Sequence, residues 1–177
     1  PARPFIEDQM AIKSPAELNL LRESIRWANL AHMLLQRYTV PGTTETVVSQ
    51  RASMEANLAM LDAIGPIYRG QNMYSEGASA GYRGQIGRNS SIPHALANNI
   101  VFQPGDVLVT GATAPVWGYV SELERSMVIG KPTDNVRRYF DHMVGLQDTA
   151  LVAMQPGKAC SEVDKAVRGY FQRHDLM

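Results

Sequence analysis

Three residues near the middle of the chain carry side chains that can move protons or hold charge. His94 follows Pro93 in a predicted turn, and Glu122 and Glu124 alternate in the segment GYVSELERS. Side chains two positions apart on a strand point to the same face, so both carboxylates can face one site. An imidazole exchanges protons near neutral pH. This pattern predicts a site of chemistry rather than a packing feature.

Each of these residues also has a structural interpretation. His94 could only shape a loop, and Glu122 and Glu124 could lie on the solvated face of an edge strand. Glu122 could also pair with Arg125, although alternation places Arg125 on the opposite face of the strand. His32 lies in the apolar stripe of a predicted helix, which favours a structural histidine.

Two helices are predicted before the glutamates. The first begins at the capping box of residues 14–17, Ser-Pro-Ala-Glu, and ends at Pro41-Gly42. Thr43 or Thr44 caps the second, which runs to Gly65. The inward positions predicted for the first helix are Leu18, Leu21, Ile25, Ala28, His32 and Leu35. Those predicted for the second are Val47, Val48, Met54, Leu58 and Leu61.

A glycine-rich stretch separates these helices from the predicted strands. Residues 66–91 lack helical periodicity, and their glycines at positions 70, 77, 81, 84 and 87 lack the Gly-Lys-Ser/Thr ending of a phosphate-binding loop. We therefore expect a substrate-facing loop or a plain connection. A Pro-Gly-Asp turn at residues 104–106 then begins an apolar strand at residues 107–110, and the glutamates lie on the next strand.

The helical plan then repeats. Thr133 is predicted to cap a helix that reaches about Met154, Pro156-Gly157 interrupts the chain, and Ser161 is predicted to cap a further helix. No strands follow this second pair, so the repeat is half finished. The first strands would keep an unpaired edge, which folded proteins normally cover. We therefore expect these residues to be part of a longer protein, and the fragment by itself to be inactive.

Composition excludes several classes of partner. The 177 residues are 45% hydrophobic, and 17 basic residues balance 17 acidic ones, so no overall field attracts nucleic acid or an anionic membrane. The single cysteine cannot form an internal disulfide, and no apolar run is long enough to span a bilayer. The sequence predicts a cytoplasmic protein.

Five segments in order resemble the pita-bread fold family of creatinase, prolidase, aminopeptidase P and methionine aminopeptidase. They are IKSPAELNLLRESIRWANLAH, the Pro-His turn, PGDVLV, GYVSELERS and QPGKACSEVDKAV. The resemblance implies an α+β fold in which helix pairs pack on a curved antiparallel sheet. It also implies three parts: a linker at residues 1–13 from a missing N-terminal domain, the first half of the catalytic domain at 14–130, and the truncated helical start of the second half at 131–177.

Two departures from the family pattern concern metal ligands. Metal-dependent members usually have an aspartate where this chain has Gly111, and a second one eleven residues later, where this chain has Glu122. A glycine offers no side chain to bridge two cations. We therefore expect no metal cofactor, with two divalent ions (manganese, zinc or cobalt) as the alternative.

Within the family, the segment at residues 123–126 and the end QRHDLM are most similar to creatinase. That resemblance implies that His94 is catalytic and that Glu124, with Glu122, binds substrate. It implies a metal-independent C–N bond hydrolase that acts on a small amine or guanidinium-type substrate, and a homodimer. One alternative is a metal-dependent Xaa-Pro aminopeptidase or prolidase with a dipeptide-like substrate. Another is a non-catalytic binding module on the same fold.

Overall fold

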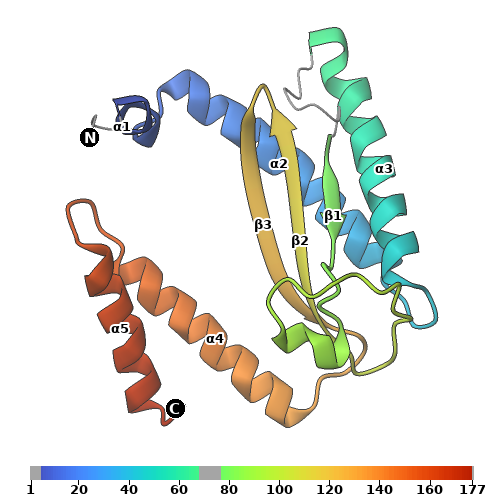
Figure 1. Ribbon diagram of the computed structural model, residues 1–177, viewed down its shortest axis with the longest axis vertical. Coiled ribbons are helices and arrows are strands. Elements are labelled where there is room, and N and C mark those ends of the chain that lie inside the picture. The colour runs from blue at the N-terminus through green and yellow to red at the C-terminus, as the bar shows by residue number, and fades with distance from the viewer. Residues whose placement is uncertain (1–4, 68–76, 177) are drawn as a thin grey trace. The chain divides into compact units, whose positions relative to one another are not determined.

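The computed structural model describes residues 5–67 and 77–176, and it divides after Lys131 into two compact units. The first unit contains helices α1 (Phe5–Ala11), α2 (Pro15–Tyr38) and α3 (Glu45–Ile64), and strands β1 (Ser79–Gly81), β2 (Val107–Val116) and β3 (Tyr119–Val128). It also contains two short 3-10 helices, η1 (Gly65–Ile67) and η2 (Gly87–Ser91). The second unit contains α4 (Asp134–Ala153) and α5 (Cys160–Arg173) (Figure 1).

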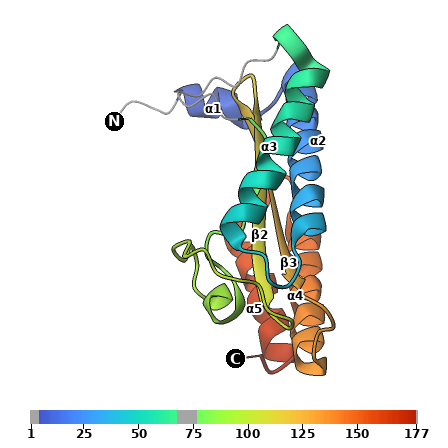
Figure 2. The same cartoon turned by 90° about the vertical axis from the view of Figure 1, so that its right-hand side faces the viewer.

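The sheet of the first unit is antiparallel, with strand order β1-β2-β3. β2 and β3 form a long curved hairpin, α2 runs behind it, and α3 flanks β1 (Figures 1 and 2). Gly111 pairs with Glu124 and Thr113 with Glu122 across the hairpin. The predicted order of helix pair and then antiparallel strands is therefore present.

Local signals in the sequence define both ends of α2. The Ser14 amide donates to the Glu17 carboxylate at 2.6 Å, and the Glu17 amide donates to the Ser14 hydroxyl at 3.4 Å, which completes the predicted capping box. The helix ends at Tyr38, before Pro41-Gly42, as predicted. Of the predicted inward positions, Ala28, His32 and Leu35 are buried, whereas Leu18 and Ile25 are exposed. The buried face is centred instead on Ser24, Trp27 and Ala31.

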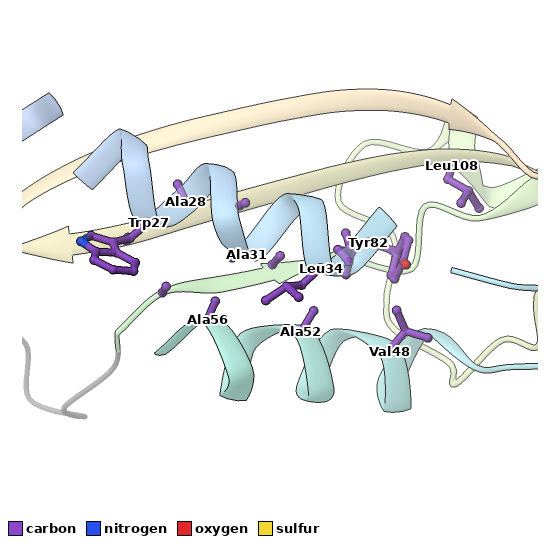
Figure 3. Close-up of a cluster of buried hydrophobic side chains, with 14 of the residues drawn as sticks. Trp27, Ala28, Ala31, Leu34, Val48, Ala52, Ala56, Tyr82 and Leu108 are labelled. Atoms are coloured by element: carbon purple, nitrogen blue, oxygen red, sulfur yellow. The ribbon is translucent and has the colours of Figure 1, made fainter. Parts of the chain in front are cut away.

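In α3 the prediction of the ends is confirmed and the prediction of the buried face is wrong. Thr44 caps the helix and Gly65 ends it. Val48 is buried as predicted, but the other buried residues are Glu45, Ala52, Ala56 and Met60, while the predicted Val47, Met54 and Leu58 are exposed. Small alanines let α3 lie close to α2 and β1 (Figure 3). The prediction placed the larger apolar side chains inward, whereas close packing buries the face that carries the small alanines.

The hydrophobic core of the first unit lies between α2, α3 and the sheet. Trp27, Ala31 and Leu34 of α2 belong to this layer, and Leu34 lies near Ala52 of α3 (Figure 3). Beyond β1, the rings of Tyr82 and Phe102 pack edge to face, with centroids 4.9 Å apart. Burial raises the pKa of the Tyr82 hydroxyl, which hydrogen-bonds Thr39. The Tyr82 contacts anchor the chain that leaves β1 toward the candidate site.

The second unit consists of two helices with different beginnings. Thr133 caps α4 as predicted, accepting a hydrogen bond from the Val136 amide at 3.3 Å. The prediction that Ser161 caps the next helix is wrong. α5 begins two residues earlier than predicted, at Cys160, and its N-cap residue Ala159 has no side chain that could accept a hydrogen bond.

Residues 1–13, interpreted from the sequence as a linker, contain the seven-residue helix α1, which has no buried residue. The glycine at position 70 lies outside the described residues. None of the helices described is long and apolar enough to cross a membrane.

Candidate functional site

Strand β3 places both glutamates on one face of the sheet. Glu122 and Glu124 alternate with partly buried Leu123, and their side chains are 69% and 42% exposed. The predicted orientation of the two carboxylates toward a common site is therefore present. Arg125 is not the partner of Glu122, because its guanidinium donates to the backbone carbonyl of Glu124.

Helix α2 holds this hairpin in place from behind. The hydroxyl of buried Ser24 donates to the Ala114 carbonyl at 2.5 Å and accepts from the Ser121 amide at 2.7 Å. The Tyr119 hydroxyl donates to the Glu17 carboxylate at 2.7 Å. These bonds attach both strands to one helix, so the positions of the glutamates depend on α2.

Arg83 is the partner of both glutamates. It lies two residues after β1, and its Nη2 is 3.2 Å from Oε1 of Glu122 and forms a second, closer ion pair with Glu124. Its backbone adopts the left-handed region (φ 53°), which is uncommon for a residue other than glycine. Arg83 was not among the site residues predicted from the sequence. The available signal was a lone arginine between the glycines at positions 81 and 84 of the predicted substrate-facing loop.

Gly111 leaves space for the guanidinium of Arg83. A Cβ atom built at this position would lie 2.7 Å from Nη2 of Arg83 and 3.2 Å from Oε1 of Glu124. Any other residue would force the guanidinium or the carboxylate to move. The glycine that removes a candidate metal ligand therefore also makes space for a cationic side chain.

A cavity of about 660 Å³ opens beside the ion pairs. Arg83 and Glu122 form its charged end, and residues of all three strands, most of them small, line the rest. A volume of this size falls in the range of small-molecule sites. Glu124 does not line the cavity but pairs with Arg83 at its edge. Together the two carboxylates and one guanidinium have a net negative charge, which favours a cationic group.

His94 lies in an exposed turn, also with a left-handed backbone (φ 52°). Among the described residues, no hydrogen bond or ion pair joins it to Glu122 or Glu124. The chain just after it is nevertheless close to Arg83. A Cβ atom on Gly84 would meet the Leu96 carbonyl oxygen at 2.1 Å. The structure therefore brings the turn of His94 next to the turn of Arg83, not the imidazole onto the carboxylates.

Buried Glu45 holds the segment that follows this turn. Its Oε1 accepts hydrogen bonds from the Asn98 amide at 2.7 Å and the Ile100 amide at 3.2 Å. A buried carboxylate that receives two amide protons makes a rigid attachment. α3 thereby positions the loop that carries His94.

His32 has the structural role that its place in α2 predicted. It is buried, and its Nε2 lies 2.8 Å from the Thr110 hydroxyl, which donates to the Arg125 carbonyl at 3.0 Å. Burial, with a smaller effect of the nearby Arg125 cation, lowers the pKa of His32 below its ordinary 6.5. A neutral imidazole thus supports the sheet from the α2 side, opposite the glutamates.

The described residues by themselves do not fit a metal centre. Such a centre needs several oxygen or nitrogen ligands. In residues 5–67 and 77–176, no group of three or more His, Cys, Asp or Glu side chains is placed to hold a metal ion. The carboxylates of Glu122 and Glu124 are already paired with Arg83. Among the described residues, this pair of carboxylates is fewer ligands than such a centre needs.

Comparison with known proteins gives a consistent family. The sequence profile of metallopeptidase family M24 matches residues 19–177. An uncharacterized peptidase of Bacillus subtilis, YqhT, is 24% identical over 173 residues, which are 96% of this chain and 44% of that protein. The Xaa-Pro dipeptidase of Pyrococcus horikoshii is 25% identical over 165 residues, or 92% of this chain and 42% of that protein. The chain thus spans less than half the length of these relatives.

Solved structures show the same fold at low sequence identity. The prolidase from Pyrococcus furiosus superimposes with a TM-score of 0.75 and 21% identity, over 96% of this chain and 46% of that one. The X-Pro aminopeptidase from Thermotoga maritima superimposes with a TM-score of 0.76 and 19% identity, over 96% and 44%. The α+β pita-bread fold predicted from the sequence is confirmed, as a partial domain.

The family match corrects one prediction. From Gly111 we expected no metal cofactor, but a family described as metallopeptidases contradicts this expectation. Divalent metal ions, the alternative, fit the family. The missing ligand at one strand position was too narrow a basis for a conclusion about the whole protein.

Proposed function

Because this chain belongs to metallopeptidase family M24, we propose that it is part of a metal-dependent peptidase of the Xaa-Pro dipeptidase or aminopeptidase type. The observation that carries the proposal is the pair of β3 carboxylates beside a cavity of about 660 Å³. Relatives with peptidase names favour this function over the creatinase-like hydrolase suggested by residues 123–126. The substrate class is a dipeptide-like molecule with proline in the second position.

The residues of this chain take distinct roles in the proposal. Glu122 and Glu124 would contribute oxygen ligands to the metal centre, and its remaining ligands would come from other residues of the whole protein. Divalent ions, when bound, supply the activation of water or of the scissile carbonyl. His94 exchanges a proton as the peptide C–N bond breaks and the amine leaves.

The organisation of the whole protein is part of the same proposal. Residues 14–130 are assigned to the first half of the catalytic domain and residues 131–177 to the start of the second half. A homodimer in the cytoplasm remains a prediction, to be checked by sedimentation and by cell fractionation.

The test uses the protein expressed from its complete coding sequence. We expect hydrolysis of Xaa-Pro dipeptides that is lost on chelation and restored by manganese, zinc or cobalt. Glu122→Gln and Glu124→Gln should each lower kcat/KM by about a hundredfold or more, and His94→Ala should chiefly lower kcat, by about a hundredfold. Glu162→Gln, which changes an exposed ion pair on α5, is the control and should act like the wild type.

Two results would replace the proposal. Hydrolysis of creatine that persists under chelation would restore the creatinase-like hydrolase. Binding of peptides without turnover, in protein loaded with each of the three metals, would establish the non-catalytic module. Unchanged kinetics in His94→Ala would remove that residue from the mechanism while leaving the peptidase in place.

A further inference from the structure

The geometry points to Arg83 as an internal cation that occupies the space between Glu122 and Glu124, so that a divalent metal ion enters this site only in competition with the guanidinium. The inference rests on the proposed function only in taking a divalent ion as the competing cation. It starts from the disagreement between a metallopeptidase family and a carboxylate pair that is already paired with an arginine.

The contacts of Arg83 show that one nitrogen serves both carboxylates. The same Nη2 atom pairs with Oε1 of Glu122 and with Oε1 of Glu124. The positively charged guanidinium therefore contacts two carboxylate oxygens from the same strand. Both carboxylates lie on one side of the sheet, so a divalent cation held by them would compete with the guanidinium.

Gly111 makes the arrangement specific. It pairs with Glu124 in the strand register, and a Cβ atom there would come within 2.7 Å of Nη2. Only glycine leaves the face of the sheet open enough for the guanidinium to lie against it. Gly111 on β2 thus lacks a side chain at the point where the guanidinium of Arg83, from the turn after β1, lies against the sheet.

The exposure of the ion pairs makes displacement feasible. The Arg83 side chain is 37% exposed and Glu122 is 69% exposed, so water screens their attraction. A guanidinium held this weakly can leave when a divalent ion binds, but it lowers the apparent affinity for that ion. For partly exposed pairs of this kind we expect a reduction of about threefold to tenfold.

The test measures metal binding without substrate. Mn²⁺ is titrated by calorimetry into the protein expressed from its complete coding sequence, as wild type and as Arg83→Gln. We expect Arg83→Gln to bind Mn²⁺ about threefold to tenfold more tightly, and the gain to vanish when Glu124→Gln is added. Arg83→Lys keeps the positive charge and should stay near the wild type. Arg88→Gln, which removes an exposed cation of η2, is the matched control.

Equal or weaker Mn²⁺ binding in Arg83→Gln would overturn the inference, as would the same gain in Arg88→Gln. If Arg83→Gln does not fold, phenylglyoxal labelling of the wild type decides instead. Saturating Mn²⁺ should speed modification of Arg83, and an unchanged rate contradicts displacement. These readouts do not involve peptide cleavage, so a protein without peptidase activity can still confirm the competition, and an active peptidase can still refute it.

Discussion

At the scale of single residues, two glycines of the site differ in what surrounds them. A Cβ atom at Gly111 would meet the end of the flexible Arg83 side chain, whereas one at Gly84 would meet the Leu96 carbonyl oxygen at 2.1 Å. Gly84 also has a left-handed backbone (φ 67°). The guanidinium can move aside, but the backbone of the His94 turn cannot do so without refolding locally.

We therefore predict that Gly84→Ala destabilises the protein by about 2 kcal/mol or more, and Gly111→Ala by less than about 1 kcal/mol. Urea unfolding of the two variants measures the difference in the free energy of unfolding. Equal losses would mean that the His94 turn is not packed against Gly84 as described.

The buried histidine of α2 gives a prediction about pH. The pKa of His32 is lowered in the folded state, so the unfolded chain binds the proton more readily. The contribution of neutral His32 to stability is complete above the unfolded value, near 6.5, and is lost as the pH falls through the folded value. Between pH 7 and pH 5 the wild type should lose more stability than His32→Gln. Parallel pH curves for the two proteins, measured by urea unfolding, would contradict this.

At the scale of elements, the two helices of the second unit test the role of capping. Thr133 accepts a hydrogen bond at the start of α4, whereas Ser161 lies inside α5 and makes no cap. We predict that Thr133→Ala costs about 1 kcal/mol and that Ser161→Ala costs a few tenths at most. Thermal unfolding followed by circular dichroism measures both. A larger loss at Ser161 would show that the helix begins later than described.

At the scale of the whole molecule, the 177-residue chain leaves many large apolar side chains in solvent. On α3 these include Val47, Met54 and Leu58, and on α4 they include Phe140 and Met143. Exposed apolar surface of this extent is typical of a surface that contacts other protein. The relatives are about twice as long as this chain. In a whole protein of that length, the additional residues are candidates for covering these apolar faces.

We predict that this chain, produced by itself, binds a hydrophobic dye such as ANS and tends to aggregate. The protein expressed from its complete coding sequence should bind several times less dye per molecule. A monomeric 177-residue chain that melts cooperatively and binds no dye would show that these apolar faces need no partner.

The sequence by itself determined where α2, α3 and α4 begin and end and that Glu122 and Glu124 lie on one face of a strand. The capping box at Ser14, the threonine caps at Thr44 and Thr133, and the Pro-Gly breaks act through contacts within a few residues, so they can be read locally. The alternation of Glu122 and Glu124 is equally local. The order of five segments was enough to predict the fold.

Only the tertiary structure decided which faces are buried and which charges meet. The inward face of α3 depends on close packing with α2 and β1, and close packing selected Ala52 and Ala56 over larger neighbours. The pairing of Arg83 with Glu122 and Glu124 joins residues about 40 positions apart through the register of the hairpin and the room left by Gly111. Contacts at this separation arise from the geometry of the assembled sheet, which no local pattern specifies.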